Sequence, residues 1–144
     1  KPILVEADRE RIMQVLSNLV VNSLKYGVKN GTTEIETNEL TSEKVLLRII
    51  DNGKGIGKEH LPRLFERFYR VEKTRNRNEG GSGLGLAIVK HIIEAHNQSI
   101  HVRSTVDVGS TFVFAGTRSK PALPFKQAWI TAWLLIAELS SCAQ

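Results

Sequence analysis

The stretch GGSGLGLAIVK, which begins at Gly80, constrains this chain most, because four glycines among six residues lead directly into an apolar, helix-forming segment. Glycines ahead of a helix let backbone N–H groups approach an anion, and the helix N-terminus adds a partial positive charge. Such a stretch suits a phosphate group. It is not a P-loop, since Gly-Lys-Ser/Thr occurs nowhere in the sequence, and its glycine spacing is not G-x-G-x-x-G. Taken alone, it fits a purely structural turn equally well.

The composition of the whole chain limits its possible fold and ligands. With 144 residues, 41% of them hydrophobic and 24% charged, the chain suits one globular domain with its own core. The net charge of +5 allows a nucleic acid, an anionic membrane surface or a polyanionic ligand such as a nucleotide. The single cysteine, Cys142, excludes an internal disulfide and a cysteine-based metal cluster. The longest apolar run, 128–137, is shorter than the roughly 17 residues that span a bilayer. We therefore expect a soluble, cytoplasmic domain.

The first half of the chain predicts a strand, a helix and a hairpin. A short strand over 3–7 precedes Asp8, a good N-cap for a helix that runs to about Tyr26. One helical stripe consists of Ile12, Leu16, Leu19 and Ser23; a second, polar stripe consists of Gln14, Asn18, Asn22 and Lys25. Segments 32–40 and 44–51 then read as two strands of a hairpin. Asp51 ends a core-facing row, so its carboxylate needs a hydrogen-bond donor.

The second half repeats this order. We expect a short helix over 58–70, a mobile loop over 71–83, a long amphipathic helix over 86–96, and paired strands over 98–105 and 109–116. Together the elements predict an α+β fold: a two-layer α/β sandwich in which helices cover one face of a mixed, mostly antiparallel sheet.

Four motifs occur in a fixed order: NLVVN on the first long helix, DNGKGIG after a strand, FERFYR, and GGSGLGLAIVK at the start of the second long helix. With these motifs, the sequence resembles the ATP-binding catalytic domain of sensor histidine kinases. The wider superfamily, with a Bergerat-type ATP-binding fold, includes gyrase, heat-shock chaperone and mismatch-repair ATPases. The likeness covers Asp8 to Phe114, so we assign residues 1–117 to this domain.

The resemblance implies a site for ATP and Mg²⁺. On the adenine side, Asp51 would accept the amino group of the base, with Ile56 packed nearby. Gly53, Gly55 and Gly57 would let the backbone pass close to the base. Thr111 also belongs to the implied nucleotide-binding set.

On the phosphate side, Asn22 would offer its amide oxygen to Mg²⁺, a cation that prefers oxygen ligands. Lys25 would reach toward the phosphates, and Tyr26 would lie beside the nucleotide, although a tyrosine there also fits a core position. The triphosphate would be wrapped by Gly81, Ser82, Gly83, Leu84, Gly85 and Leu86. Either Arg67 or Arg70 would contact the γ-phosphate. Both also fit an ordinary position on the solvent-exposed face of their helix.

Asn18 distinguishes two branches of the superfamily. In the hydrolases, a glutamate one helical turn before the Mg²⁺-binding asparagine activates water. An amide cannot take a proton from water, and a positioned base is worth roughly 10²- to 10⁴-fold in rate. Asn18 therefore favours a protein-histidine kinase, which donates the γ-phosphate of ATP to a histidine in the autophosphorylation step of two-component signal transduction. A slow ATPase is the alternative.

The acceptor histidine is expected on a separate dimerisation domain. None of His60, His91, His96 and His101 lies in the family's His-Asp/Glu stretch with a following proline. The resemblance further implies a downstream response regulator and a dimeric, membrane-associated parent kinase, for which the inner membrane is one location, while this fragment is expected to be monomeric.

Two segments leave other functions open. Lys73, Arg75 and Arg77 could bind nucleic acid, but no aromatic residues interleave with them, so a charged lid is favoured and no nucleic-acid partner is expected. Residues 118–144 depart from the family and contain Trp129 and Trp133 one helical turn apart. This tail fits a docking helix, a membrane-surface helix or residues foreign to the natural protein, and we favour the last.

Overall fold

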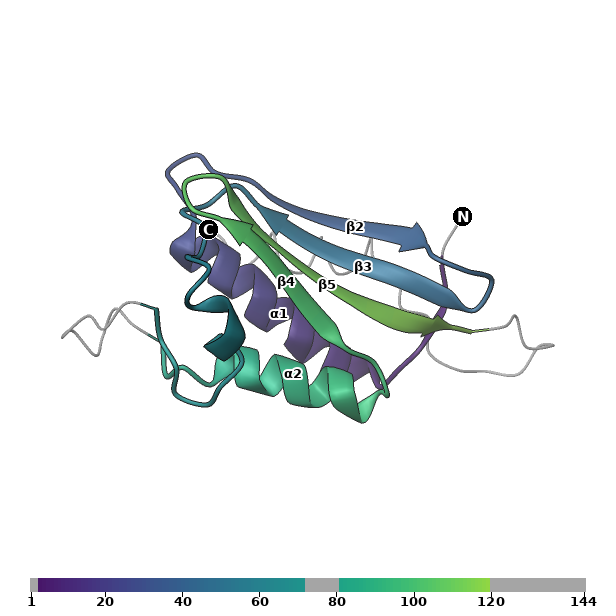
Figure 1. Cartoon of the computed structure of the whole chain (residues 1–144). Helices are drawn as coiled ribbons and strands as arrows, with labels where there is room; N and C mark the ends of the chain where they lie inside the picture. The colour runs from purple at the N-terminus through teal and green to yellow at the C-terminus, as the bar shows by residue number, and fades with distance from the viewer. Residues whose placement is uncertain (1–2, 72–80, 120–144) are drawn as a thin grey trace.

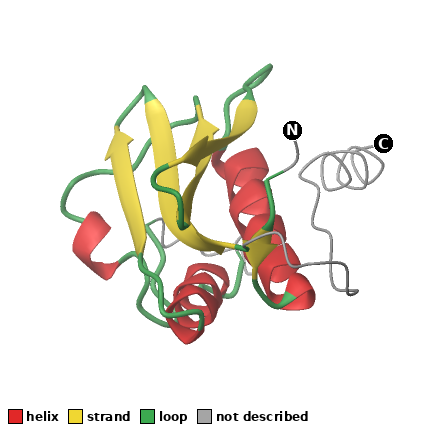
Figure 2. Cartoon of the chain, turned by 90° about the vertical axis from the view of Figure 1, so that its right-hand side faces the viewer, coloured by secondary structure: helices red, strands yellow, loops and turns green. Residues whose placement is uncertain are grey.

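Two helices pack side by side against one face of a five-stranded sheet in the computed structural model, which describes residues 3–71 and 81–119 (Figure 1). The elements, in chain order, are β1 (Val5–Glu6), α1 (Arg9–Tyr26), β2 (Thr33–Glu39), β3 (Lys44–Asp51), a short 3-10 helix (Leu61–Arg63), α2 (Gly85–Ala95), β4 (Ile100–Thr105) and β5 (Gly109–Arg118). Figure 2 shows the same two layers from a view turned by 90°. The expected two-layer α+β sandwich is confirmed.

Strand β5 is the centre of the sheet. It pairs with β3 on one side and with β4 and β1 on the other, and β2 pairs with the outer edge of β3. Every pairing among the described strands is antiparallel, so the expectation of a mixed sheet is wrong in this detail. The reason is that β2–β3 and β4–β5 are both hairpins, and β5 runs back along β3. The register places Ser110 opposite Asp51, at the end of β3 that approaches α1.

The core lies between the helices and the sheet. The predicted apolar stripe of α1 is confirmed, since Ile12, Leu16, Leu19 and Ser23 are all buried. The three apolar ones pack in one cluster with residues from α2 and the sheet, including Ile93, Ile49, Phe112 and Phe114. Each fully buried aliphatic or aromatic side chain contributes about 1.5–3 kcal/mol to stability. This packing fixes the rotation of α1 about its axis, so its polar stripe is turned away from the core.

The N-terminal end of α1 is linked to the C-terminal end of α2 by a hydrogen bond between Asp8 and His96. Asp8 caps α1 as predicted, because its Oδ1 accepts the N–H of Arg11 at 3.0 Å. The backbone N–H of Asp8 in turn donates to Nε2 of His96 at 3.1 Å. Since Nε2 accepts, Nδ1 of His96 carries the proton and donates to the carbonyl of Ile92 at 2.8 Å. After α2, Asn97 adopts the left-handed conformation with φ 55°, as expected for the residue that follows the helix.

Two predicted elements are shorter than expected. The first strand is limited to β1, which pairs only with the last two residues of β5 before the chain turns into α1. The helix over 58–70 is wrong, because only Leu61–Arg63 forms a 3-10 turn. Phe68 adopts φ 64°, a left-handed conformation that a helix cannot contain, and donates its N–H to the carbonyl of Gly83 at 2.9 Å.

Two further expectations fall outside the described residues. They are most of the expected loop over 71–83, with Lys73, Arg75 and Arg77, and almost all of the 118–144 tail, with Trp129, Trp133 and Cys142. Within the described ranges, the structure contains no helix with the length and apolar character needed to cross a membrane.

Candidate functional site

A cavity of about 290 Å³ lies beside the C-terminal half of α1. Its walls come from α1, the facing ends of β3 and β5, the segment after β3, and the glycine-rich start of α2. These segments carry the four sequence motifs. The fold therefore brings the motifs together at one place.

Helix α1 contributes three of the four residues of the predicted polar stripe. Asn18, Asn22 and Lys25 line the cavity, whereas Gln14 lies outside it. Tyr26 also lines it and is 44% exposed, so this residue is not part of the core. Asn18 lies against the first residue of α2, because a Cβ built on Gly85 would be 3.5 Å from its Oδ1.

Asp51 presents an oriented carboxylate at the end of β3. Its Oδ1 accepts the backbone N–H of Gly53 at 2.9 Å and that of Ser110 at 3.3 Å. The carboxylate is half-buried and lines the cavity. The sequence suggested that adenine supplies its missing hydrogen-bond donor, but two backbone N–H groups already donate to it. Among the described residues, both of its hydrogen bonds use Oδ1, which leaves Oδ2 available to a ligand.

The glycines after Asp51 have different surroundings. Gly55 lines the cavity at φ 69°, where an added Cβ would run into the Thr105 carbonyl. Gly53 and Gly57 do not line it: a Cβ on Gly53 would lie 2.8 Å from the Tyr26 carbonyl, and one on Gly57 would meet the Glu59 carboxylate. Gly53 therefore has a structural reason for glycine, because its neighbour is backbone, whereas the flexible Glu59 side chain could move aside at Gly57.

Ile56 lines the cavity as predicted. Its backbone N–H donates to Oγ of Ser104 at 2.8 Å, and that hydroxyl donates to the carbonyl of Gly109 at 2.9 Å. The loop that carries Ile56 is thus attached to the adjoining ends of β4 and β5.

The glycine-rich stretch forms the opposite wall. Gly81, Ser82, Gly83, Gly85 and Leu86 line the cavity, and α2 begins there at Gly85. Backbone N–H groups at this end of the helix carry partial positive charge. Leu84 does not line the cavity. It lies in a second hollow along α1 and α2.

The structure separates the two candidate arginines. Arg70 lines the cavity, whereas Arg67 lines the second hollow. Thr111 is placed outside the cavity because side chains alternate along β5, so that its neighbours Ser110 and Phe112 face inward instead.

Several cavity residues escaped the sequence reasoning: Ser23, Lys54, Leu64, Tyr69, Val71, Ser110 and Phe112, together with Val21. The pairing of β3 with β5 could have indicated Ser110, which lies opposite Asp51. Of the charged side chains that line the described cavity, Lys25, Lys54 and Arg70 are cationic and only Asp51 is acidic. The cavity is therefore suited to a polyanionic ligand with a hydrogen-bond donor at one end.

Comparisons with known proteins agree with this geometry. Residues 7–117 match the family of histidine kinase-, DNA gyrase B- and HSP90-like ATPases. The sensor histidine kinase WalK of Bacillus subtilis is 38% identical over 135 residues, which are 92% of this chain and 21% of WalK.

Among solved structures, the mycobacterial sensor histidine kinase MprB superposes with a TM-score of 0.70 at 26% identity, over 79% of this chain and 76% of that one. Full-length ShkA in complex with AMPPNP gives a TM-score of 0.69 at 27% identity, over 84% of this chain and 24% of that one. The chain thus spans about a fifth of WalK and a quarter of ShkA. It belongs to the family of histidine kinase-, DNA gyrase B- and HSP90-like ATPases, as a catalytic domain of the sensor histidine kinase type.

Proposed function

We propose that this chain binds Mg-ATP in the cavity and donates the γ-phosphate to a histidine on a separate dimerisation domain. The observation that carries the proposal is the oriented carboxylate of Asp51 in a cavity whose other charged side chains are cations and whose wall includes the start of α2. A free carboxylate oxygen fits the amino group of adenine, and the cationic end fits a triphosphate. The complex of ShkA with AMPPNP supports a nucleotide as the ligand.

The donor set also fits Mg²⁺. Asn22 offers one amide oxygen, and Mg²⁺ keeps most of its positions for water and phosphate oxygens. The described residues contain no group of three or more His, Cys, Asp or Glu side chains that could hold a metal, so a dedicated protein cage is not proposed. When bound, Mg²⁺ would neutralise charge on the phosphates.

Asn18 favours transfer over hydrolysis. It lies one helical turn before Asn22 in the cavity wall, and its amide cannot take a proton from water. A bound triphosphate would therefore be protected until a better nucleophile arrives. Arg70 lines the same cavity and would stabilise charge on the γ-phosphate during transfer.

The acceptor would come from outside this chain. All four histidines lie in the described residues, and none lines the cavity. His60 and His96 are engaged by Tyr69 and Ile92, and His91 lines the second hollow. We propose a dimeric, membrane-associated parent kinase that supplies the acceptor histidine, phosphorylates a response regulator and holds this domain in the cytoplasm.

Calorimetry with Mg-ATP tests the binding step. We expect one nucleotide per chain and weaker binding when EDTA removes Mg²⁺. Asn22→Ala should reproduce the effect of EDTA in the presence of Mg²⁺, because it removes the amide oxygen. The absence of binding to the wild-type chain would refute the proposal.

A further inference from the structure

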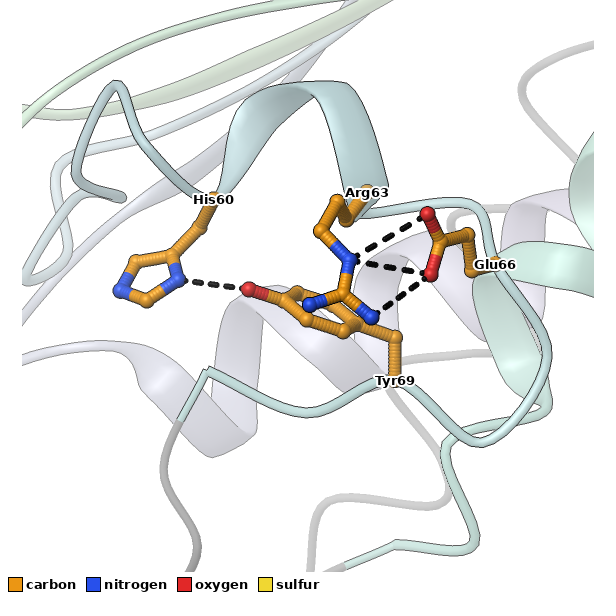
Figure 3. Close-up of polar contacts among 4 residues, drawn as sticks. All are labelled: His60, Arg63, Glu66 and Tyr69. Atoms are coloured by element: carbon orange, nitrogen blue, oxygen red, sulfur yellow. Dashed lines mark hydrogen bonds and ion pairs between the residues drawn. The ribbon is translucent and has the colours of Figure 1, made fainter.

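Tyr69 is held by side chains on two sides, although the segment that carries it has little regular structure (Figure 3). Its hydroxyl lies 2.7 Å from Nδ1 of His60. The guanidinium carbon of Arg63 lies 4.5 Å from the centre of the Tyr69 ring. The ring is half-buried and lines the cavity, whereas His60 and Arg63 do not. Two residues outside the cavity thus contact one residue of its wall.

Arg63 is itself fixed over the ring. Its Nη2 and Nε lie 3.0 and 3.1 Å from Oε2 of Glu66. The hydrogen bond that Arg63 donates to Glu66 and the charge of this carboxylate hold the pKa of the Arg63 guanidinium above its usual value. A guanidinium plane over an aromatic face adds attraction between the cation and the ring electrons.

His60 is oriented by a second carboxylate. Its Nε2 lies 3.4 Å from Oε1 of Glu59. With the Nε2 proton facing this carboxylate, Nδ1 is the acceptor for the hydroxyl proton of Tyr69. The hydroxyl is therefore directed toward His60.

Backbone hydrogen bonds alone leave the position of Tyr69 weakly determined. Its N–H donates to the carbonyl of Glu66 at 3.3 Å, and the preceding residue, Phe68, has a left-handed conformation. Leu64 is buried in the core and anchors the segment on one side. The side-chain contacts of His60 and Arg63 supply the remaining restraint on the ring.

We propose that Tyr69 contacts the bound nucleotide and that His60 and Arg63 are positioning residues that hold its ring in place. This inference rests on the proposed function, because the ligand of the cavity is taken to be Mg-ATP. Immobilising one side chain on binding costs roughly 0.5–1.5 kcal/mol, which is about two- to tenfold in Kd. A ring that is already held avoids this cost.

The test compares Mg-ATP affinity by calorimetry in four variants. Tyr69→Phe removes the hydroxyl, and His60→Leu removes its acceptor. We expect each to weaken binding by about three- to tenfold. In His60→Asn, the side-chain oxygen lies near the position of Nδ1, so affinity should stay within about twofold of wild type. The matched control is His101→Leu, because His101 is exposed on β4 and contacts Ser99, and it should bind like wild type.

The double variant His60→Leu/Tyr69→Phe shows whether the two residues affect binding through their shared hydrogen bond or each independently. If the two residues act through one hydrogen bond, the double variant should bind about as weakly as either single variant. Losses that multiply, or single variants that bind as wild type does, would overturn the inference. Thermal melting of each ligand-free variant identifies any loss of fold, and Tyr69→Phe keeps the ring volume. A wild-type chain that binds no Mg-ATP would instead refute the proposed function.

Discussion

Oδ1 of Asp51 lies 2.9 Å from the backbone nitrogen of Gly53, and this hydrogen bond determines which carboxylate oxygen faces the cavity. The N–H of Ser110 donates to the same oxygen. Both donors come from backbone on either side of the end of β3. The orientation of the carboxylate is therefore built into the sheet and the turn that follows it.

Asp51→Asn tests this orientation. The asparagine oxygen can accept both backbone N–H groups, so its NH₂ group would face the cavity, where adenine presents a donor of its own. Two N–H donors that face each other without an acceptor cost about 1–3 kcal/mol of binding free energy. Mg-ATP affinity should therefore fall by roughly 10- to 100-fold. The melting temperature should change little. Calorimetry and thermal melting measure both quantities, and unchanged affinity would remove Asp51 from the adenine site.

Arg70→Gln and Arg67→Gln form a matched pair, because only Arg70 lines the cavity. If Arg70 contacts the γ-phosphate, its replacement should weaken Mg-ATP more than Mg-ADP. The expected difference is roughly tenfold, the scale of one charge-assisted hydrogen bond. Arg67→Gln should leave both affinities as in the wild type. Equal losses for ATP and ADP in Arg70→Gln would place the arginine elsewhere along the nucleotide.

Gly83→Ala should destabilise the start of the glycine-rich wall. Gly83 has φ 73°, and an added Cβ would lie 2.8 Å from Cα of Phe68. A left-handed alanine alone costs about 1–2 kcal/mol, which in a domain of this size lowers the melting temperature by several degrees. Gly85→Ala is the control, since its Cβ would meet nothing closer than 3.5 Å and alanine favours a helix. Equal melting temperatures for both variants would contradict the strain at Gly83.

The sequence predicted those parts of the fold that depend on local pattern. Ile12, Leu16 and Leu19 recur at helical spacing, and Asp8 is a typical N-cap just before them. For this reason α1 and its polar face could be predicted without knowledge of the sheet. The segment 58–70 could not, because its apolar residues have helical spacing while Phe68 pairs with Gly83, a contact between distant positions.

Long-range register decided the remaining differences at the site. The partner of Asp51, Ser110, is set by the pairing of β3 with β5. The same register turns Thr111 away from the cavity and Ser110 toward it. Likewise, Arg67 and Arg70 are indistinguishable by pattern, and only the path of the backbone past Phe68 sends them to different hollows.

The most direct measurement follows γ-labelled ATP incubated with the wild-type chain, with and without the histidine-bearing dimerisation domain of the same kinase. Because Asn18 offers no general base, the chain alone should release phosphate very slowly, and Asn18→Glu should raise that rate if water reaches the γ-phosphate. With the dimerisation domain present, label should appear on that domain as acid-labile, base-stable phosphohistidine, and Asn22→Ala should abolish the transfer. Rapid release of phosphate by the wild-type chain, with an unlabelled dimerisation domain, would contradict the kinase assignment and identify an ATPase.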